Sequence, residues 1–145
     1  MKHIAILSRK WQMLEKIESG EKTIESRWYK SRFKPWDSIQ AGEIVYFKET
    51  GKDVCLQARI ARVEQIDNIT PSTVRQTLNL HQKDLGIDKS DIELYYQHFK
   101  DKKYCILIYL AEPKPINPFK LNKAGIGMMS AWICFRKLTD IKMKS

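Results

Sequence analysis

Short apolar runs separated by turn signals recur along most of the chain. Runs of this kind are typical of β-strands, whereas an apolar stripe with helical spacing is typical of an amphipathic helix. The segments expected to form strands are 4–7, 23–28, 44–48, 54–66, 104–110 and 131–138. Within 54–66 the apolar alternation changes phase near Ile60, which predicts a β-bulge or a bend there.

Three segments carry helix signals. In the first, apolar side chains at 11, 14 and 17 follow helical spacing, and Gly20 lies where that helix would end. In the second, Thr70 is a favourable N-cap residue and Pro71 suits the first helical position, so a helix to about residue 80 is expected. The third, 90–99, begins with the spacing of a capping box and continues with an apolar stripe.

Two further stretches show no regular pattern. The segment 29–36 is polar and aromatic and is expected to be a loop, while Pro113, Pro115 and Pro118 are expected to prevent regular structure after the fifth strand. Consecutive strands with short helical inserts favour a barrel over a parallel α/β sheet. We therefore expect an α+β fold in one domain over 1–145. Its core would be a closed or half-open mixed β-barrel of about five or six strands, with an N-terminal helix and one or two inserted helices.

Charge and composition narrow the classes of partner. The net charge of +9 is large for 145 residues and favours an anionic partner. We find no signal peptide and no apolar run long enough to cross a bilayer, so a cytoplasmic protein without a membrane partner is expected. Cys55, Cys105 and Cys134 lie in separate apolar runs and are expected to be free buried thiols. The histidines show no ligand spacing, so neither a metal nor a cofactor is expected.

The densest cluster of functional groups is the segment 22–36, where basic and aromatic residues interleave. If its first part is extended, Glu25 and Arg27 lie on the same face of the strand. Such a pair can orient a phosphate or a base edge, with Glu25 as a hydrogen-bond acceptor or a general base. A structural ion pair would leave the same pattern, so both interpretations stay open.

Neighbouring side chains suit a single-stranded nucleic acid. A base could stack on Trp28, and Lys30 and Arg32 could contact phosphates. The alternative is that aromatic rings cap the end of the barrel while the cationic groups are simply solvated. The aromatic residues of 28–36 lie too close together to be core residues throughout, so at least one is expected to be exposed.

Two later segments supply further candidates. Tyr46 and Lys48 share one strand face, and Lys52 follows in the next turn. A tyrosine hydroxyl beside ammonium groups can bind phosphate, and a desolvated lysine can act as base or nucleophile, although Lys52 also fits an ordinary turn. Ser130 and Trp132 lie on one face at the start of the last strand, where the hydroxyl could reach a cleft. No G-x-S-x-G motif surrounds Ser130, which argues against a serine-hydrolase triad.

Three consecutive motifs resemble the ASCH family. They are Gly-Glu-Lys-Thr-Ile-Glu-Ser-Arg at 20–27, Ala-Gly-Glu before the strand at 44–48, and the alternating strand at 58–63. The final strand, which begins at Ser130-Ala131-Trp132, is similar to the tryptophan-bearing last strand of longer members. The resemblance implies a PUA-like barrel, with 67–103 matching only as a helical insert.

Two groups of ASCH members suggest different chemistry. Members that resemble ribonucleases have a tyrosine, a lysine and a serine in the cleft, and Tyr46, Lys52 and Ser130 are similar to that set. Members that resemble amidohydrolases of acetylated cytidine pair a threonine with the lysine aligned to Lys22. This chain keeps Lys22 and has Glu25 in place of the threonine.

The resemblance therefore implies a basic, aromatic-lined cleft that receives RNA or a modified nucleoside or nucleotide. Its expected lining is Lys22, Glu25, Arg27, Tyr46, Lys48 and Ser130. The first hypothesis is an RNA- or nucleotide-binding domain, active as a monomer or a weak homodimer. The alternative is a metal-independent hydrolase of RNA or acylated nucleosides, in which Lys22 or Lys52 is the base and Glu25 or Ser130 assists. A third hypothesis is a protein-interaction domain with exposed aromatic residues.

Overall fold

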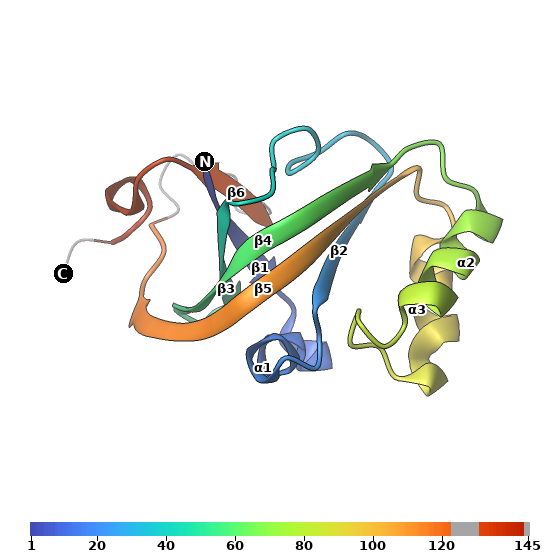
Figure 1. Cartoon of the computed structure of the whole chain (residues 1–145), viewed down its shortest axis with the longest axis horizontal. Coiled ribbons are helices and arrows are strands. Elements are labelled where there is room, and N and C mark those ends of the chain that lie inside the picture. The colour runs from blue at the N-terminus through green and yellow to red at the C-terminus, as the bar shows by residue number, and fades with distance from the viewer. Residues whose placement is uncertain (123–130, 144–145) are drawn as a thin grey trace.

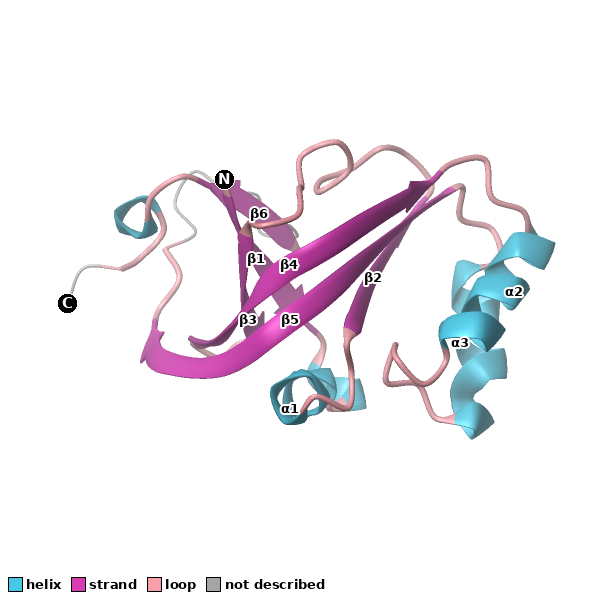
Figure 2. Cartoon of the chain, viewed as in Figure 1, coloured by secondary structure: helices cyan, strands magenta, loops and turns pink. Residues whose placement is uncertain are grey.

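The computed structural model describes residues 1–122 and 131–143, which form one curled mixed sheet with helices packed around it (Figures 1 and 2). The strands are β1 (Lys2–Leu7), β2 (Ile24–Tyr29), β3 (Ile44–Glu49), β4 (Val54–Ile66), β5 (Tyr104–Phe119) and β6 (Trp132–Phe135). Their order across the sheet is β2-β5-β4-β3-β1-β6. The pair β1 and β3 is parallel and the other pairs are antiparallel. The predicted α+β class is confirmed, with the sheet as a half-barrel.

The α-helices of the described residues are α1 (Met13–Ser19), α2 (Pro71–His81) and α3 (Ile92–Phe99), and a short 3-10 turn, η1 (Arg9–Trp11), precedes α1. Gly20 ends α1 with a positive φ of 85°, and the Thr70 side chain accepts from the backbone N–H of Thr73 at the start of α2. Both helix ends agree with the prediction. The capping box predicted at Ser90 is wrong, because a 3-10 turn covers 89–91 and α3 starts at Ile92 without a side-chain cap.

The longest strand departs from the sequence prediction. β5 continues through Pro113, Pro115 and Pro118, where regular structure was not expected. β2 pairs with β5 as far as Tyr109, and the Leu110 N–H donates to the Thr23 carbonyl just before β2. Beyond Leu110, β5 pairs with β4 alone. A strand with one open edge tolerates proline, because the missing N–H can lie on the unpaired side. The predicted bend near Ile60 is confirmed by a register shift against β5 between Ile60 and Arg62.

Alternation along the strands separates the core into clusters on opposite faces of the sheet. One face carries the central cluster, to which Ala5, Phe47 and Ile108 belong. On the opposite face, the β2 end of the sheet packs against the helical insert through residues such as Trp28, Leu78 and Leu107. The β1 end of that face carries a third cluster that includes Ile4, Tyr46, Val54, Phe119, Ile133, Phe135 and Ile141. In Figure 1, α2 and α3 stand beside β2, and α1 lies at the lower edge of the sheet.

The last predicted strand is shorter than expected, covering Trp132–Phe135 and not 131–138, because the chain turns into a 3-10 turn at Leu138–Asp140. All three cysteines are free, as predicted, but only Cys105 is buried, while Cys55 and Cys134 are partly exposed. None of the described helices is both long and apolar enough to cross a membrane.

Candidate functional site

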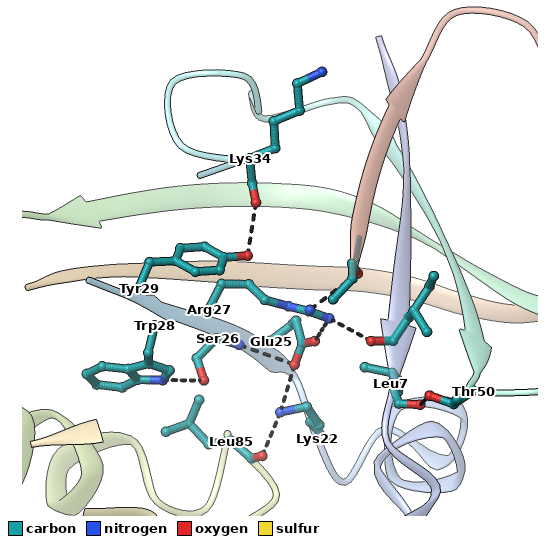
Figure 3. A network of polar contacts seen from close by, with 12 residues as sticks. Leu7, Lys22, Glu25, Ser26, Arg27, Trp28, Tyr29, Lys34, Thr50 and Leu85 are labelled. Carbon is teal, nitrogen blue, oxygen red and sulfur yellow. Dashed lines mark hydrogen bonds and ion pairs between the residues drawn. The ribbon is translucent and has the colours of Figure 1, made fainter. Parts of the chain in front are cut away.

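A buried cluster of three charges lies where β2 begins. The Lys22 Nζ is 3.4 Å from Glu25 Oε1, and Arg27 Nη2 is 2.8 Å from Glu25 Oε2. Their side chains are exposed by only 3%, 7% and 12% in chain order. Figure 3 shows Glu25 between the two cationic groups. The predicted shared face of Glu25 and Arg27 is thus confirmed as a direct contact.

The backbone around Lys22 explains why this side chain is buried. Gly20 turns the chain after α1, and the N–H groups of Thr23 and Ile24 then donate to the carbonyl of Asp84 at 2.8 and 2.9 Å. This loop from the helical insert also supplies the Leu85 carbonyl, which accepts from Lys22 Nζ at 2.7 Å. Gly86 also packs tightly against Lys22, because a Cβ added at Gly86 would lie only 3.0 Å from Lys22 Cβ.

Arg27 spans the open side of the half-barrel. β2 and β6 are the two outer strands of the sheet, and the Arg27 guanidinium reaches from β2 to the other edge. It donates to the carbonyls of Ile6 and Ala131, both at 3.4 Å, and lies 5.2 Å from the centre of the Trp132 ring. Arg27 therefore links the two edges of the sheet while it holds Glu25.

The charges of the cluster do not balance, since two cations surround one carboxylate. Burial lowers the pKa of Lys22, and the attraction of Glu25 offsets this only in part. Burial alone would raise the pKa of Glu25, but Arg27 and then Lys22 outweigh it and lower that pKa. Loss of a proton from Lys22 would leave a neutral Arg27–Glu25 pair in a medium where excess charge is costly. Glu25 is therefore the ionised acceptor, and Lys22 is the group that releases a proton more easily than an ordinary lysine.

A pocket of about 120 Å³ opens onto Lys22 and Glu25. Its other walls come from the end of β1, from η1, from the first residue of α1, from β2 and from the insert. They are Leu7, Ser8, Trp11, Met13, Ser26, Leu85, Ile87, Tyr95 and Phe99. A second, more open pocket of about 390 Å³ shares Trp11, Tyr95 and Phe99 with it and adds Trp28, His98 and Lys102. We call the two together the aromatic cleft. Lys22 and Glu25 of the charged cluster line its inner pocket, whereas Arg27 lines neither pocket and pairs with Glu25.

The rings of the aromatic cleft support one another. Trp28 stacks on Phe99 with centroids 4.7 Å apart and an interplanar angle of 7°, and its indole N–H donates to Ser26 Oγ at 2.9 Å. Trp11 meets Tyr95 at 5.1 Å. Aromatic rings held in this way lose little conformational freedom when a flat ligand packs against them.

Several predicted site residues lie elsewhere. Tyr46 projects from the opposite face of the sheet, 6.3 Å from the Phe119 ring and 6.1 Å from the Phe135 ring, and Lys48 is buried on that same face of β3. Lys52 is exposed in the turn between β3 and β4. The expected joint lining of one cleft by Tyr46, Lys48 and Glu25 is therefore not what the fold produces, because Tyr46 packs in the third core cluster and neither Tyr46 nor Lys48 lines the aromatic cleft. Ser130 lies outside the described residues.

The predicted phosphate contacts belong to a separate surface. Lys30 and Arg32 are exposed in the loop after β2, where the Arg32 guanidinium lies 5.9 Å from the Trp36 ring and 5.5 Å from the Tyr104 ring. Phe33 in the same loop is 61% exposed, as expected for at least one aromatic residue of this segment.

Sequence reasoning missed the walls of the cleft. Trp11, Tyr95 and Phe99 were assigned to the apolar stripes of two helices, and a stripe does not reveal which of its members borders a pocket. His3 was also missed. It is fully buried, its Nδ1 accepts from the Trp132 indole N–H at 3.0 Å, and its Nε2 lies 2.8 Å from Glu43 Oε1. Since an indole nitrogen only donates, the proton of neutral His3 is on Nε2 and is donated to Glu43.

Metal ligation has no support in the described ranges 1–122 and 131–143, where no three His, Cys, Asp or Glu side chains are grouped to hold an ion. The chemistry available at the cluster is that of a desolvated lysine, an ionised carboxylate and a guanidinium, next to flat apolar walls.

Comparison with known proteins identifies the fold. Neither a protein-family model nor a curated protein matches the sequence. Among solved structures, an ASCH protein from Zymomonas mobilis is 17% identical with a TM-score of 0.66, over 94% of this chain and 88% of that chain. A variant of that protein with a tyrosine replaced by phenylalanine is 17% identical with a TM-score of 0.67, over 94% of this chain and 91% of that chain. The N-terminal domain of Staphylothermus marinus McrB is 14% identical with a TM-score of 0.51, over 82% and 76%. The predicted resemblance is thus confirmed in three dimensions: this chain has the fold of an ASCH domain.

Proposed function

We propose that the aromatic cleft binds a nucleotide, either free or as one unit of an RNA strand. The observation that carries this proposal is that Lys22 and Glu25 of the buried cluster line a pocket whose walls include the rings of Trp11, Tyr95 and Phe99. A nucleobase needs two things from a protein: a flat apolar surface for its faces and polar groups for its edge. The walls supply the first and the cluster supplies the second.

The polar part of the cluster suits a base edge. The Glu25 carboxylate can accept from a ring or exocyclic N–H, because an ionised carboxylate has more acceptor positions than its contacts here use. Arg27 also keeps a buried Nε–H with no hydrogen-bond partner among the described residues, but Arg27 lines neither pocket of the cleft. A ligand that offers an N–H would therefore use acceptor positions that Glu25 leaves open.

Charge favours a phosphate-bearing ligand over a neutral one. The chain has a net charge of +9, and Lys102 and His98 line the larger pocket of the cleft. Lys30 and Arg32 on the separate loop surface extend the basic character beyond the cleft. For a longer RNA we therefore expect the cleft to hold a base while these groups contact neighbouring phosphates, with affinity that falls as salt rises.

The experiment that tests this proposal is a titration of the protein with the four ribonucleoside monophosphates and with a short single-stranded RNA, followed by tryptophan fluorescence and calorimetry. Trp11→Ala removes one wall of both pockets. Because stacking of a base is worth roughly 1–3 kcal/mol, this change should weaken mononucleotide binding by roughly 5- to 150-fold.

Phe33→Ala is the matched control, since Phe33 is an exposed aromatic residue on the loop surface and lines neither pocket. Mononucleotide affinity should be unchanged in this variant. Absence of binding by the wild-type protein, or equal losses in the two variants, would refute the proposed site.

A hydrolase acting at the same cluster is the second candidate function, and the lowered pKa of buried Lys22 favours it. In that mechanism the Lys22 amine takes a proton from the water that attacks the acyl carbonyl and then returns it to the departing nucleoside group, and Arg27 keeps Glu25 ionised beside it. Incubation with acylated nucleosides and with labelled RNA in EDTA tests this candidate. Turnover that disappears in Lys22→Met would support it, and turnover that persists there but disappears in Lys52→Ala would favour the ribonuclease set instead.

A further inference from the structure

The hydroxyl of Tyr95 is a buried polar group whose environment is incomplete. Tyr95 lies on α3, and its ring lines both pockets of the aromatic cleft between Trp11 and Phe99. The Oη atom is buried, yet it has no hydrogen-bond partner among the residues that the structure describes. Folded proteins pair most buried polar groups, so a buried, unpaired hydroxyl on a side chain that lines a cleft points to a partner that arrives with a ligand.

The position of this hydroxyl relative to the charged cluster defines what it could recognise. Tyr95, Lys22 and Glu25 line the same inner pocket, and the nearby carboxylates Asp91, Glu25 and Asp88 add to the effect of burial in raising the pKa of Tyr95. The hydroxyl therefore stays protonated at neutral pH and can donate. Glu25, being ionised, can only accept.

We infer that Tyr95 is a ligand-contacting residue that donates its hydroxyl proton to an oxygen or ring nitrogen on the edge of a bound base, while Glu25 accepts from an N–H of that base. This inference rests on the proposed function and deepens it. It assigns the inserted helix α3 a direct part in recognition, and it specifies the ligand as a planar heterocycle that carries both an acceptor and a donor. A bare sugar phosphate lacks such an edge.

The test replaces Tyr95 by phenylalanine, which removes the hydroxyl and keeps the ring. Tyr96→Phe is the matched control on the same helix, because the Tyr96 ring lies under the Arg75 guanidinium at 3.7 Å and lines neither pocket. The ligands are the tightest-binding ribonucleoside monophosphate and ribose 5-phosphate, and the readouts are affinity by calorimetry and Tm without ligand.

The expected result for Tyr95→Phe is a mononucleotide affinity about tenfold lower, as for loss of one hydrogen bond, with an unchanged or higher Tm. Tyr95→Phe should bind ribose 5-phosphate as weakly as wild type does. Tyr96→Phe should match wild type in both affinity and Tm. The combination matters because a purely structural hydroxyl would show the opposite: a lower Tm with affinity unaffected.

Three outcomes would overturn the inference, and they are distinguishable. If Tyr95→Phe binds the mononucleotide as tightly as wild type, the proposed function stands and the role of Tyr95 falls. If its Tm drops markedly, the hydroxyl has a partner within the protein. If wild type binds no mononucleotide at all, the proposed function fails and this inference fails with it.

Discussion

Replacing Glu25 by glutamine tests how strongly the charged cluster depends on its one carboxylate. Glutamine keeps the shape of the side chain and removes the charge between Lys22 and Arg27. At an effective dielectric constant of about 20, N···O separations of 2.8 and 3.4 Å correspond to gross attractions of about 6 and about 5 kcal/mol. Most of this offsets desolvation in the folded protein, so the net loss is smaller than the sum.

We expect Glu25→Gln to lower the free energy of unfolding by about 3–5 kcal/mol, the range for breaking a buried ion pair on one side. For a chain of this size the corresponding fall in Tm is roughly 6–20 °C. Chemical denaturation at pH 7 and calorimetry measure the two quantities. The matched control is Glu93→Gln, because Glu93 meets Arg75 at only 2.6 Å but both side chains are exposed. That variant should be as stable as wild type.

A second substitution identifies the origin of the loss. Lys22→Met in the Glu25→Gln background removes one of the two cations left without a counter-charge, so the double variant should lose less stability than the two single losses added together, by about 0.5–3 kcal/mol. Additive losses, or a Glu25→Gln effect as small as that of Glu93→Gln, would refute the view that buried charge governs this site.

The pH dependence of the same variants follows from the pKa directions. The wild-type Glu25 has a lowered pKa, so its contribution to stability is present above about pH 4.3 and is lost as pH falls through the lower, folded-state pKa. In Glu25→Gln the carboxylate that raises the pKa of Lys22 is gone, so that pKa falls further. The unfolded chain then binds more protons than the folded one below about pH 10.4, so the stability of the variant should rise as pH increases toward that value.

Three further predictions concern residues around the site. The pKa of His3 is lowered, chiefly by burial, so the stability of the wild type should decline as pH falls below about 6.5, and that of His3→Asn and His3→Gln should not. The asparagine oxygen can still accept from the Trp132 indole N–H. Chemical denaturation should therefore show His3→Gln to be less stable than His3→Asn by about 1–3 kcal/mol. Arg32→Ala should reduce the slope of log affinity for single-stranded RNA against log salt by about 0.7, and an unchanged slope would remove Arg32 from the phosphate contacts. Burial raises the pKa of the Cys105 thiol and encloses it, so iodoacetamide should leave Cys105 unlabelled in the native protein and label it in denaturant.

Much of the local structure follows from the amino-acid sequence alone. Alternation placed Glu25 and Arg27 on one face of a strand, the Thr70-Pro71 pair placed the start of α2, and the phase change near Ile60 placed a bend. These features depend on residues a few positions apart, whose relative directions are set by the backbone geometry of a helix or a strand. The motif that begins at Gly20 also indicated the fold, which the comparison with ASCH structures confirms.

The surroundings of those residues depend on contacts between distant parts of the chain. Lys22 is buried because the carbonyl of Leu85, 63 positions away, accepts from it, and Arg27 crosses to a carbonyl at Ala131, 104 positions away. The regular β5 beyond Leu110 depends on its having no second neighbour there. Tyr46 is excluded from the cleft because it packs against the rings of Phe119 and Phe135, which lie far along the chain. Contacts of this kind are fixed by strand order and by packing between distant segments, and neither leaves a periodic signal in the chain.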